Sequence, residues 1–295
     1  MDAKKNESWP KISIVTPSYN QANFLEQTIQ SVLYQGYPNL EYIIIDGGST
    51  DGSQEIIQKY EKHLAFWCSE KDQGHYYAVS KGFERSTGEI MGWINSDDLY
   101  CPWSLKTVGS IFQNLREVRW ISTLNSLYWS KDGYCIFLRP NPGFSAHAFA
   151  DGEYATFRTA RSGFVQQEST FWRRNLWDQA RGIDLNFKLA ADFDLWARFY
   201  EIDELYGVYS PLAGFRFHDT NRSRDHNAYL AEVEASLSQF RNNNPSLASR
   251  FRRTFKSAIR HIPMFRSHVK VYSALNIYRS TAEEGDQWVI RKVQF

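Results

Sequence analysis

Short apolar runs alternate with helical segments four times in the first part of this chain. The runs span residues 11–16, 41–45, 64–69 and 90–94, and their β-branched and aromatic side chains are typical of buried strands. Between them lie segments whose apolar residues recur at helical spacing. This alternation predicts right-handed βαβ units that build a mostly parallel sheet, which is an α/β fold.

Each apolar run leads into a polar turn. The four turns read PSYNQAN, DGGSTDG, DQG and NSDD in chain order. Because ligands of such sheets bind outside the carboxyl ends of the strands, we expect the four turns to line one crevice. The last turn contains the adjacent carboxylates of Asp97 and Asp98. Adjacent carboxylates repel each other and are costly to desolvate, so this pair favours a site where a cation binds against a phosphate.

The composition excludes several classes of protein. Apolar residues make up 42% and charged residues 23%, so neither a disordered chain nor a membrane-embedded one is expected. The net charge of +1 gives no general attraction to nucleic acid, and no run approaches the roughly 20 apolar residues of a spanning helix. The widely spaced Cys68, Cys101 and Cys135 suit neither a disulfide framework nor a zinc site. We therefore expect a cytoplasmic protein with free thiols that binds no nucleic acid.

Two later segments contain polar residues beside apolar ones. Gln166, Gln167 and Glu168 directly precede the apolar Phe171 and Trp172. Gln167, Glu168 and Trp172 suit the lip of a binding site, but a strand with one solvated face explains the pattern equally well. Asp192 and Asp194 lie near the start of an expected helix, where the helix dipole alone favours negative charge.

Three stretches resemble successive motifs of the family 2 glycosyltransferases. They are residues 14–53, which begin IVTPSYN and end IIIDGGSTDGS, residues 72–100, which end GWINSDDLY, and ADFDLW at 191–196. The resemblance covers about residues 10–220 and implies the type A glycosyltransferase fold, an αβα sandwich with a mostly parallel sheet. It also implies inverting transfer of a sugar from a nucleoside diphosphate sugar to an acceptor hydroxyl, in polysaccharide or lipid-linked oligosaccharide synthesis.

The resemblance implies a donor site at the predicted crevice. Tyr19 would lie against the nucleotide base and Asp97 near the ribose, while Asp98 would hold Mg²⁺ or Mn²⁺ against the diphosphate with His218 as a further contact. Gly47 and Asn95 depart from the family pattern because acidic residues are usual at both positions. The implied donor-binding residues are Pro17, Tyr19, Asn20, Asp46, Gly47, Asp72, Lys81 and Asp97.

Inverting transfer requires a general base that removes the proton of the acceptor hydroxyl. By resemblance this base is Asp192, although Ala191 replaces the Glu that usually precedes it, and Asp194 and Glu168 are the alternatives. Two other functions stay open, a non-catalytic protein that binds sugar nucleotides and a sugar nucleotidyltransferase. The second would need a basic phosphate loop after the first strand, which PSYNQAN does not provide. No Gly-x-Gly-x-x-Gly motif follows a strand, so a dinucleotide-dependent dehydrogenase is disfavoured.

A change in composition near residue 228 predicts two parts. We expect a catalytic domain over 1–228, with a nucleotide-binding half at about 10–118 and an acceptor half at about 119–228, and a helical extension over 229–295. Basic and apolar residues interleave between 250 and 270 without an acidic residue. Two interpretations remain open: a helix on an anionic membrane surface, which would place the protein peripherally at the inner face of the membrane, or a helix docked on the catalytic domain.

Overall fold

The computed structural model describes residues 9–155, 163–219, 221, 226–247, 272–281, 283 and 285–295. Its first part follows the predicted alternation of strands and helices. In chain order the elements are β1 (Ile12–Ser18), α1 (Ala22–Leu33), β2 (Leu40–Asp46), α2 (Ser53–Tyr60), the 3-10 turn η1 (Glu61–His63), β3 (Phe66–Ser69), α3 (His75–Arg85) and β4 (Ile90–Trp93). β1 pairs in parallel with β2 and β4, and β2 pairs in parallel with β3, so the predicted parallel sheet is confirmed.

Later strands extend this sheet beyond β4. They are β6 (Trp120–Thr123), β9 (Phe171–Arg173), β10 (Tyr206–Val208), β12 (Ser273–Arg279) and β13 (Trp288–Gln294). Within the described residues the sheet has nine strands, in the order β13-β12-β10-β6-β9-β4-β1-β2-β3. The short β9 lies antiparallel between β4 and β6, whereas β10 pairs in parallel with β6 and β12. Most neighbouring strands of the sheet are therefore parallel.

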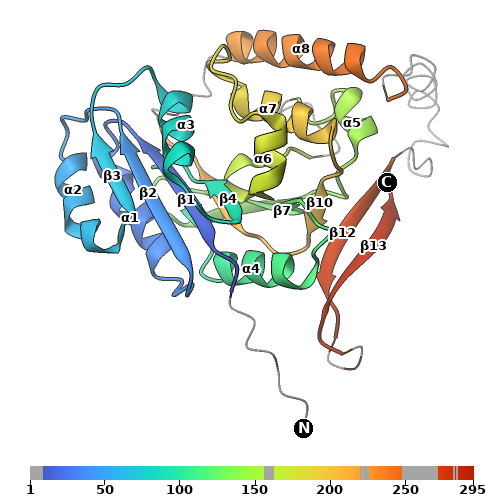
Figure 1. Ribbon diagram of the computed structural model, residues 1–295, viewed down its shortest axis with the longest axis horizontal. Helices are drawn as coiled ribbons and strands as arrows, with labels where there is room; N and C mark the ends of the chain where they lie inside the picture. The colour runs from blue at the N-terminus through green and yellow to red at the C-terminus, as the bar shows by residue number, and fades with distance from the viewer. Residues whose placement is uncertain are drawn as a thin grey trace.

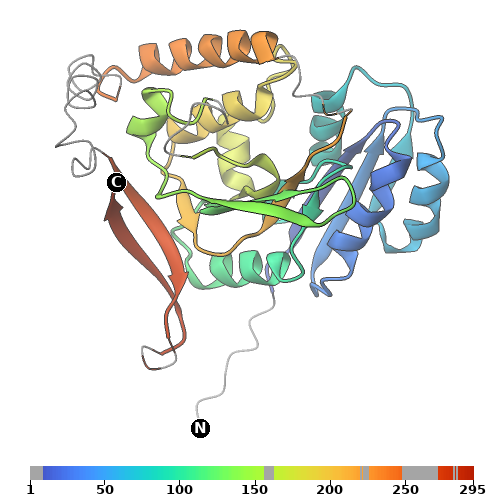
Figure 2. The same ribbon diagram turned by 180° about the vertical axis from the view of Figure 1, so that it is seen from behind.

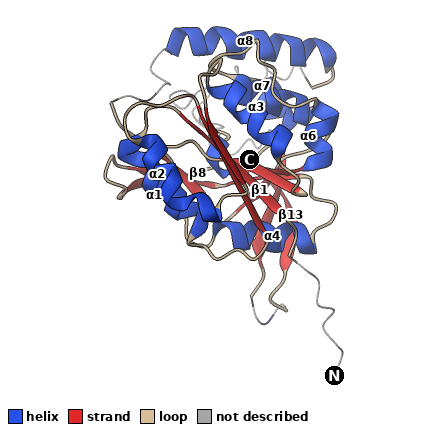
Figure 3. Ribbon diagram, turned by 60° about the vertical axis from the view of Figure 1, so that its left-hand side comes forward, coloured by secondary structure: helices blue, strands red, loops and turns tan. Residues whose placement is uncertain are grey.

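Helices cover both faces of this sheet (Figure 1 and Figure 3). One face packs against α1, α2 and α4 (Ser104–Asn114), and the other against α3, α6 (Arg174–Ala180) and α7 (Ala191–Tyr200). β1 shows how its sequence serves both faces, because Ile12 and Ile14 belong to the first core and Val15 to the second. Gly82 lets α3 approach β1 closely, since a Cβ atom there would lie 2.4 Å from Cγ1 of Val15. The result is the predicted αβα sandwich.

A second, smaller sheet crosses the front of the molecule in Figure 2. It consists of β5 (Leu99–Tyr100), β11 (Ala213–Arg216), β7 (Asn125–Trp129) and β8 (Cys135–Pro140), in the order β5-β11-β7-β8. β5 directly follows the NSDD turn and pairs antiparallel with β11. This pairing brings the end of β11 next to the two carboxylates that follow β4.

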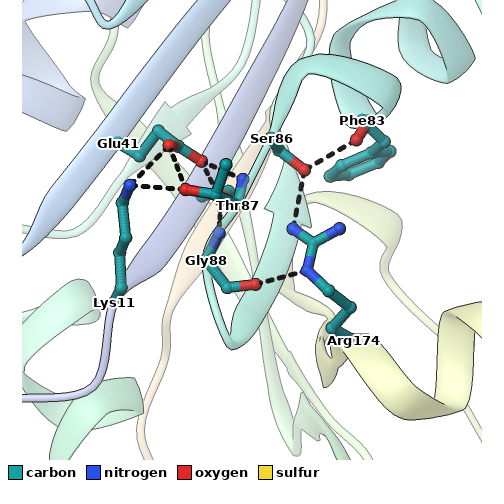
Figure 4. Close-up of polar contacts among 8 residues, drawn as sticks. Lys11, Glu41, Phe83, Ser86, Thr87, Gly88 and Arg174 are labelled. Carbon is teal, nitrogen blue, oxygen red and sulfur yellow. Dashed lines mark hydrogen bonds and ion pairs between the residues drawn. The ribbon is translucent and has the colours of Figure 1, made fainter.

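A polar network around Glu41 joins the amino-terminal ends of β1, β2 and β4 (Figure 4). The buried Glu41 carboxylate accepts hydrogen bonds from Lys11 Nζ, from Ser13 Oγ, and from both the backbone N and Oγ1 of Thr87. Arg174 holds the same turn from the other side through the carbonyl of Gly88 and the hydroxyl of Ser86. The turn that begins β4 is therefore tied to β1, β2 and α6.

The part of the chain after residue 226 is only partly helical. α8 (His226–Asn243) is the expected helix, and its Val233, Leu237 and Phe240 are buried in the core that contains α7. β12 and β13 form a hairpin that joins the main sheet instead of adding a further helix. The basic stretch 250–270 lies outside the described residues. No helix in the part of the chain that the structure describes is long and apolar enough to cross a membrane.

Candidate active site

The turns after β1 and β2 meet at the predicted crevice. The backbone N of Asn20 donates to Ser49 Oγ over 2.8 Å, and Asn20 Oδ1 accepts from the backbone N of Thr50 over 3.0 Å. Asn20 adopts a left-handed conformation with φ of 50°, which Asn tolerates better than most residues. Two loops that were predicted to line one crevice are thus joined directly.

Asp46 fixes the turn after β2 by hydrogen bonds. Its carboxylate is fully buried and accepts hydrogen bonds from Gly48 N, Ser49 N and Oγ, and Ser69 Oγ at distances of 2.5–3.1 Å. A carboxylate with this many donors is held by the protein itself. Asp46 therefore orders the glycine-rich turn after β2 and links it to β3. Pro17, which was also predicted to bind the sugar donor, is buried within β1.

The side chains of Tyr19 and Asp72 both lie close to Gly47. The Tyr19 side chain is 63% exposed. A Cβ atom on Gly47 would lie 3.3 Å from Tyr19 Cδ2 and 3.2 Å from Asp72 Oδ2. Glycine at this position therefore leaves the Tyr19 ring and the Asp72 carboxylate next to each other. Asp72 also accepts a hydrogen bond from the backbone N of Gly74, which fixes its orientation.

Lys81, the one basic residue predicted for the donor site, forms an ion pair with Glu70. The hydrogen bond from this pair raises the pKa of Lys81 above its ordinary value. Its ammonium group is therefore already neutralised by a residue that directly follows β3.

The two adjacent carboxylates after β4 occupy different environments. Asp98 is fully buried, and its Oδ1 and Oδ2 accept hydrogen bonds from the backbone N of Arg216 and from Asn95 Nδ2. Burial above all, and then the charges of Glu168 and Asp97, raise the pKa of Asp98 well above its usual value. Asp97 is partly exposed, and its Oδ2 lies 2.9 Å from His218 Nε2. Asp97 is thus the more accessible of the two carboxylates, the His218 side chain is almost fully buried beside it, and Asp98 joins β4 to β11.

These residues fit a divalent cation that has few protein ligands. Within the described part of the chain no group of three or more His, Cys, Asp or Glu side chains is placed to hold a metal. A carboxylate and an imidazole are ligands of Mn²⁺, and Mg²⁺ usually binds through one or two carboxylates with phosphate oxygens completing its shell. Beside them the buried guanidinium of Arg216 has three nitrogen atoms without a hydrogen-bond partner among the described residues. The negative charges of Asp98 and Asp97 interact favourably with this buried cation.

Asp192 lies in the first turn of α7. Its Oδ1 accepts a hydrogen bond of 3.1 Å from the hydroxyl of Tyr76, which comes from α3 in the nucleotide-binding half. Asp194 points elsewhere, because it pairs with Arg198 and accepts from Ser236. The two acidic residues of this helix therefore differ: Asp192 contacts α3, and Asp194 forms a salt bridge within α7.

Glu168 is a buried carboxyl group between these parts of the site. It lies in η2 (Gln167–Ser169), and its Oε1 has no hydrogen-bond partner among the described residues. Burial, with added contributions from the charges of Asp97 and Asp192, raises the pKa of Glu168 to about 8. With this pKa the Glu168 carboxyl group is mainly protonated at neutral pH.

The expected acceptor lip is partly corrected by the structure. Trp172 is fully buried, and its ring packs against those of Trp93, Trp177 and Trp196. It is a core residue and cannot face an acceptor. Gln167 is also largely buried and donates to the carbonyl of Trp93 at the end of β4.

Two residues of this site were not singled out from the sequence. Tyr76 is an ordinary member of an amphipathic helix, and nothing local indicates its contact with Asp192. Arg216 did carry a signal, because an Arg at the end of an apolar strand two residues before His218 is an unusual residue to bury.

Comparison with known proteins agrees with this geometry. Residues 13–118 match the family described as glycosyl transferase family 2. Over these residues the chain is similar to that family. The matched segment contains the turns after β1, β2, β3 and β4.

Similarity to known glycosyltransferases extends beyond this segment. An uncharacterized glycosyltransferase of Rickettsia typhi is 27% identical over 240 residues, which are 80% of this chain and 73% of the relative. The putative teichuronic acid biosynthesis glycosyltransferase TuaG of Bacillus subtilis is 40% identical over 94 residues, which are 30% of this chain and 36% of TuaG.

The crystal structure of S. aureus TarS 1-349 in complex with UDP-GlcNAc gives a TM-score of 0.64 at 15% identity, over 88% of this chain and 74% of that one. This likeness shows that the chain has the type A glycosyltransferase fold.

Proposed function

We propose that this glycosyltransferase moves a sugar, with inversion at the anomeric carbon, from a nucleoside diphosphate sugar to an acceptor hydroxyl. The observation that carries the proposal is the hydrogen bond of 3.1 Å from the hydroxyl of Tyr76, in the nucleotide-binding half, to the carboxylate of Asp192. The proposed base is therefore attached to the half of the molecule that would bind the donor. Inverting transfer needs such an arrangement, because the hydroxyl attacks from the side opposite the leaving diphosphate.

The donor would bind with its base at the Tyr19 ring and the Asp72 carboxylate, and with its ribose and diphosphate toward Asp97. Asp97 and His218 would hold Mn²⁺ or Mg²⁺, and Asp98 would support them from behind through Arg216 and Asn95. When bound, the cation would neutralise negative charge on the leaving diphosphate. Arg216 would add a fixed positive charge beside it. The complex of TarS with UDP-GlcNAc supports a nucleoside diphosphate sugar as the donor class.

Asp192 would accept the proton of the attacking hydroxyl. The hydrogen bond from Tyr76 fixes the orientation of this carboxylate, and α3 thereby links the base to the nucleotide-binding half. Glu168 and Gln167 would border the acceptor, while the neutral form of Glu168 avoids a third negative charge in this region. The description of TuaG as a putative teichuronic acid biosynthesis enzyme supports a growing polysaccharide as the acceptor class.

A donor screen tests the proposal. The purified chain is incubated with a panel of uridine, guanosine and thymidine diphosphate sugars and Mn²⁺, and release of nucleoside diphosphate is followed with and without saccharide acceptors. We expect release from one donor class, and none from the Asp192→Asn variant above background. Absence of release from every donor, despite nucleotide binding, would favour a non-catalytic protein that binds sugar nucleotides.

A further inference from the structure

One face of α8 is directed at the turn that precedes Asp192. Tyr229, Glu232 and Ser236 are spaced three and four residues apart, so they share this face of the helix. α8 lies across the molecule on the outer side of α7 in Figure 1. Glu232 bonds the backbone of residues 188–190, and Ser236 bonds Asp194. These residues lie outside the family match, which ends at residue 118.

Glu232 makes the strongest of these contacts. Its two carboxylate oxygens accept hydrogen bonds from three consecutive backbone N–H groups, those of Lys188, Leu189 and Ala190, at distances of 2.8–3.0 Å. Consecutive N–H groups that point at one anion form a strong and directional site. The carboxylate of Glu232 therefore fixes the backbone immediately before α7.

α7 has no cap from its own sequence. Its N-cap residue is Ala190, which has no side chain that could accept from the first turn. A negative charge at a helix N-terminus also interacts favourably with the helix dipole. Glu232 thus places a negative charge at the N-terminus of α7 and fixes the backbone N of its N-cap residue, two residues before Asp192.

The turn is held from the opposite side as well. Tyr76 of α3 lies 3.0 Å from the carbonyl of Leu189 and 3.1 Å from Asp192 Oδ1. On the side of α8, the buried hydroxyl of Tyr229 has no hydrogen-bond partner among the described residues. Burial, and then the charge of Asp192, raise the pKa of Tyr229 well above its usual value, so this hydroxyl stays protonated.

We propose that Glu232 is a positioning residue for Asp192 and that α8 is part of the active site. The inference rests on the proposed function, in which Asp192 is the general base. Loss of the three hydrogen bonds would let the 188–190 backbone shift, and a base displaced by about 1 Å can lose about 100-fold in rate. Binding of the donor, which takes place at the ends of β1, β2 and β4, would not change.

The test compares Glu232→Ala and Glu232→Gln with a matched control, Glu234→Ala. Glu234 lies on the same helix but is exposed and pairs with Arg241. With the donor found in the screen, we expect kcat of Glu232→Ala to fall by about tenfold or more, with the donor KM within about twofold of wild type. Glu232→Gln retains one acceptor oxygen and should fall by about threefold or more. Glu234→Ala should match the wild type.

A second readout does not depend on turnover. Hydrogen–deuterium exchange at the amides of residues 188–190 should be faster in Glu232→Ala than in Glu234→Ala. Wild-type kcat in both Glu232 variants, with Asp192→Asn inactive, would overturn the inference while leaving the proposed function intact. Wild-type turnover by Asp192→Asn would instead remove the proposed base. If Glu232→Ala does not fold, Glu232→Gln carries the test, and a wild-type kcat in it overturns the inference.

Discussion

His218 Nε2 lies 2.9 Å from Asp97 Oδ2, although the two residues are 121 positions apart in the chain. The antiparallel pairing of β5 with β11 brings them together, because β5 directly follows Asp98 and β11 ends two residues before His218. A pair assembled from two sheets in this way is held in place by the fold, and Asn221 Nδ2 also lies 2.9 Å from His218 Nε2.

Asp97→Ala and His218→Ala should each weaken metal-dependent binding of the nucleotide by about tenfold or more, which corresponds to about 1.4 kcal/mol. Titration calorimetry of UDP and of GDP, with Mn²⁺ and with EDTA, measures this effect. His63→Ala, a change in an exposed residue of η1, is the control. Equal affinity with Mn²⁺ and EDTA in the wild type would remove the cation from this site.

Asp98→Ala should act differently from these two variants. The change leaves the backbone N of Arg216 and the amide of Asn95 without their buried acceptor, which typically costs about 1–3 kcal/mol. We therefore expect a lower melting temperature as well as weaker nucleotide binding. A variant with wild-type stability that has lost only the dependence on Mn²⁺ would show that Asp98 is itself a metal ligand.

Asp192→Asn should abolish transfer while donor binding stays within about twofold of wild type. Removal of a general base typically costs about 10²–10⁴-fold in rate. Asp194→Asn is the matched comparison on the same helix, because its carboxylate pairs with Arg198. We expect that variant to lose stability and to retain turnover. The opposite result, with Asp194→Asn inactive and Asp192→Asn active, would exchange the two roles.

Stability at acidic pH should depend on Glu41. Burial alone raises the pKa of this carboxyl, but the hydrogen bonds from Lys11, Ser13 and Thr87 outweigh it and lower the pKa from 4.5 to about 2. A folded-state pKa below the unfolded value gives a stabilisation that is complete above about pH 5 and is lost as the pH falls toward 2.

Glu41→Gln should therefore lower the free energy of unfolding by about 2 kcal/mol at pH 7 and by much less near pH 2. Urea unfolding at several pH values measures this difference. Glu61→Gln, at an exposed position, should not change the pH dependence. A constant destabilisation by Glu41→Gln at every pH would contradict the role of its charge.

Trp172→Ala should destabilise the fold by about 3–5 kcal/mol, the usual range for a buried Trp. Its ring lies among those of Trp93, Trp177 and Trp196, so truncation leaves a cavity in the core. Chemical denaturation measures the loss. An unchanged unfolding midpoint together with a raised acceptor KM would return Trp172 to the acceptor site.

The sequence predicted the location of the site better than its details. Parallel strands bring their carboxyl ends to one edge, so the meeting of the turns after β1 and β2 could be predicted from the pattern, although the individual contacts of Asn20 could not. The orientation of Trp172 did not, because β9 is a three-residue strand whose inner face is fixed by pairing with β4 and β6. The different environments of Asp97 and Asp98 likewise depend on β11, which lies more than a hundred residues further along the chain.

Long-range pairing also explains the unexpected hairpin after residue 272. Its strands alternate only weakly between apolar and polar residues, and their place is set by β10, a strand of three residues. The sequence could not connect Glu232 with Asp192, because a Glu on a helix usually belongs to its solvated face.

The pairing of β12 with β10 has a consequence for the order in which the protein is made. Domains fold as units during synthesis, yet here β10 gains its outer neighbour only when residues 273–279 have emerged. The contact of Glu232 with the turn before Asp192 also forms late. A nascent chain that ends after the family segment would carry the turns after β1 to β4 without the completed sheet, without His218 and without a fixed base. Contacts that join such distant parts of a sequence slow folding, so full activity should appear only after the last strands of the sheet have been made.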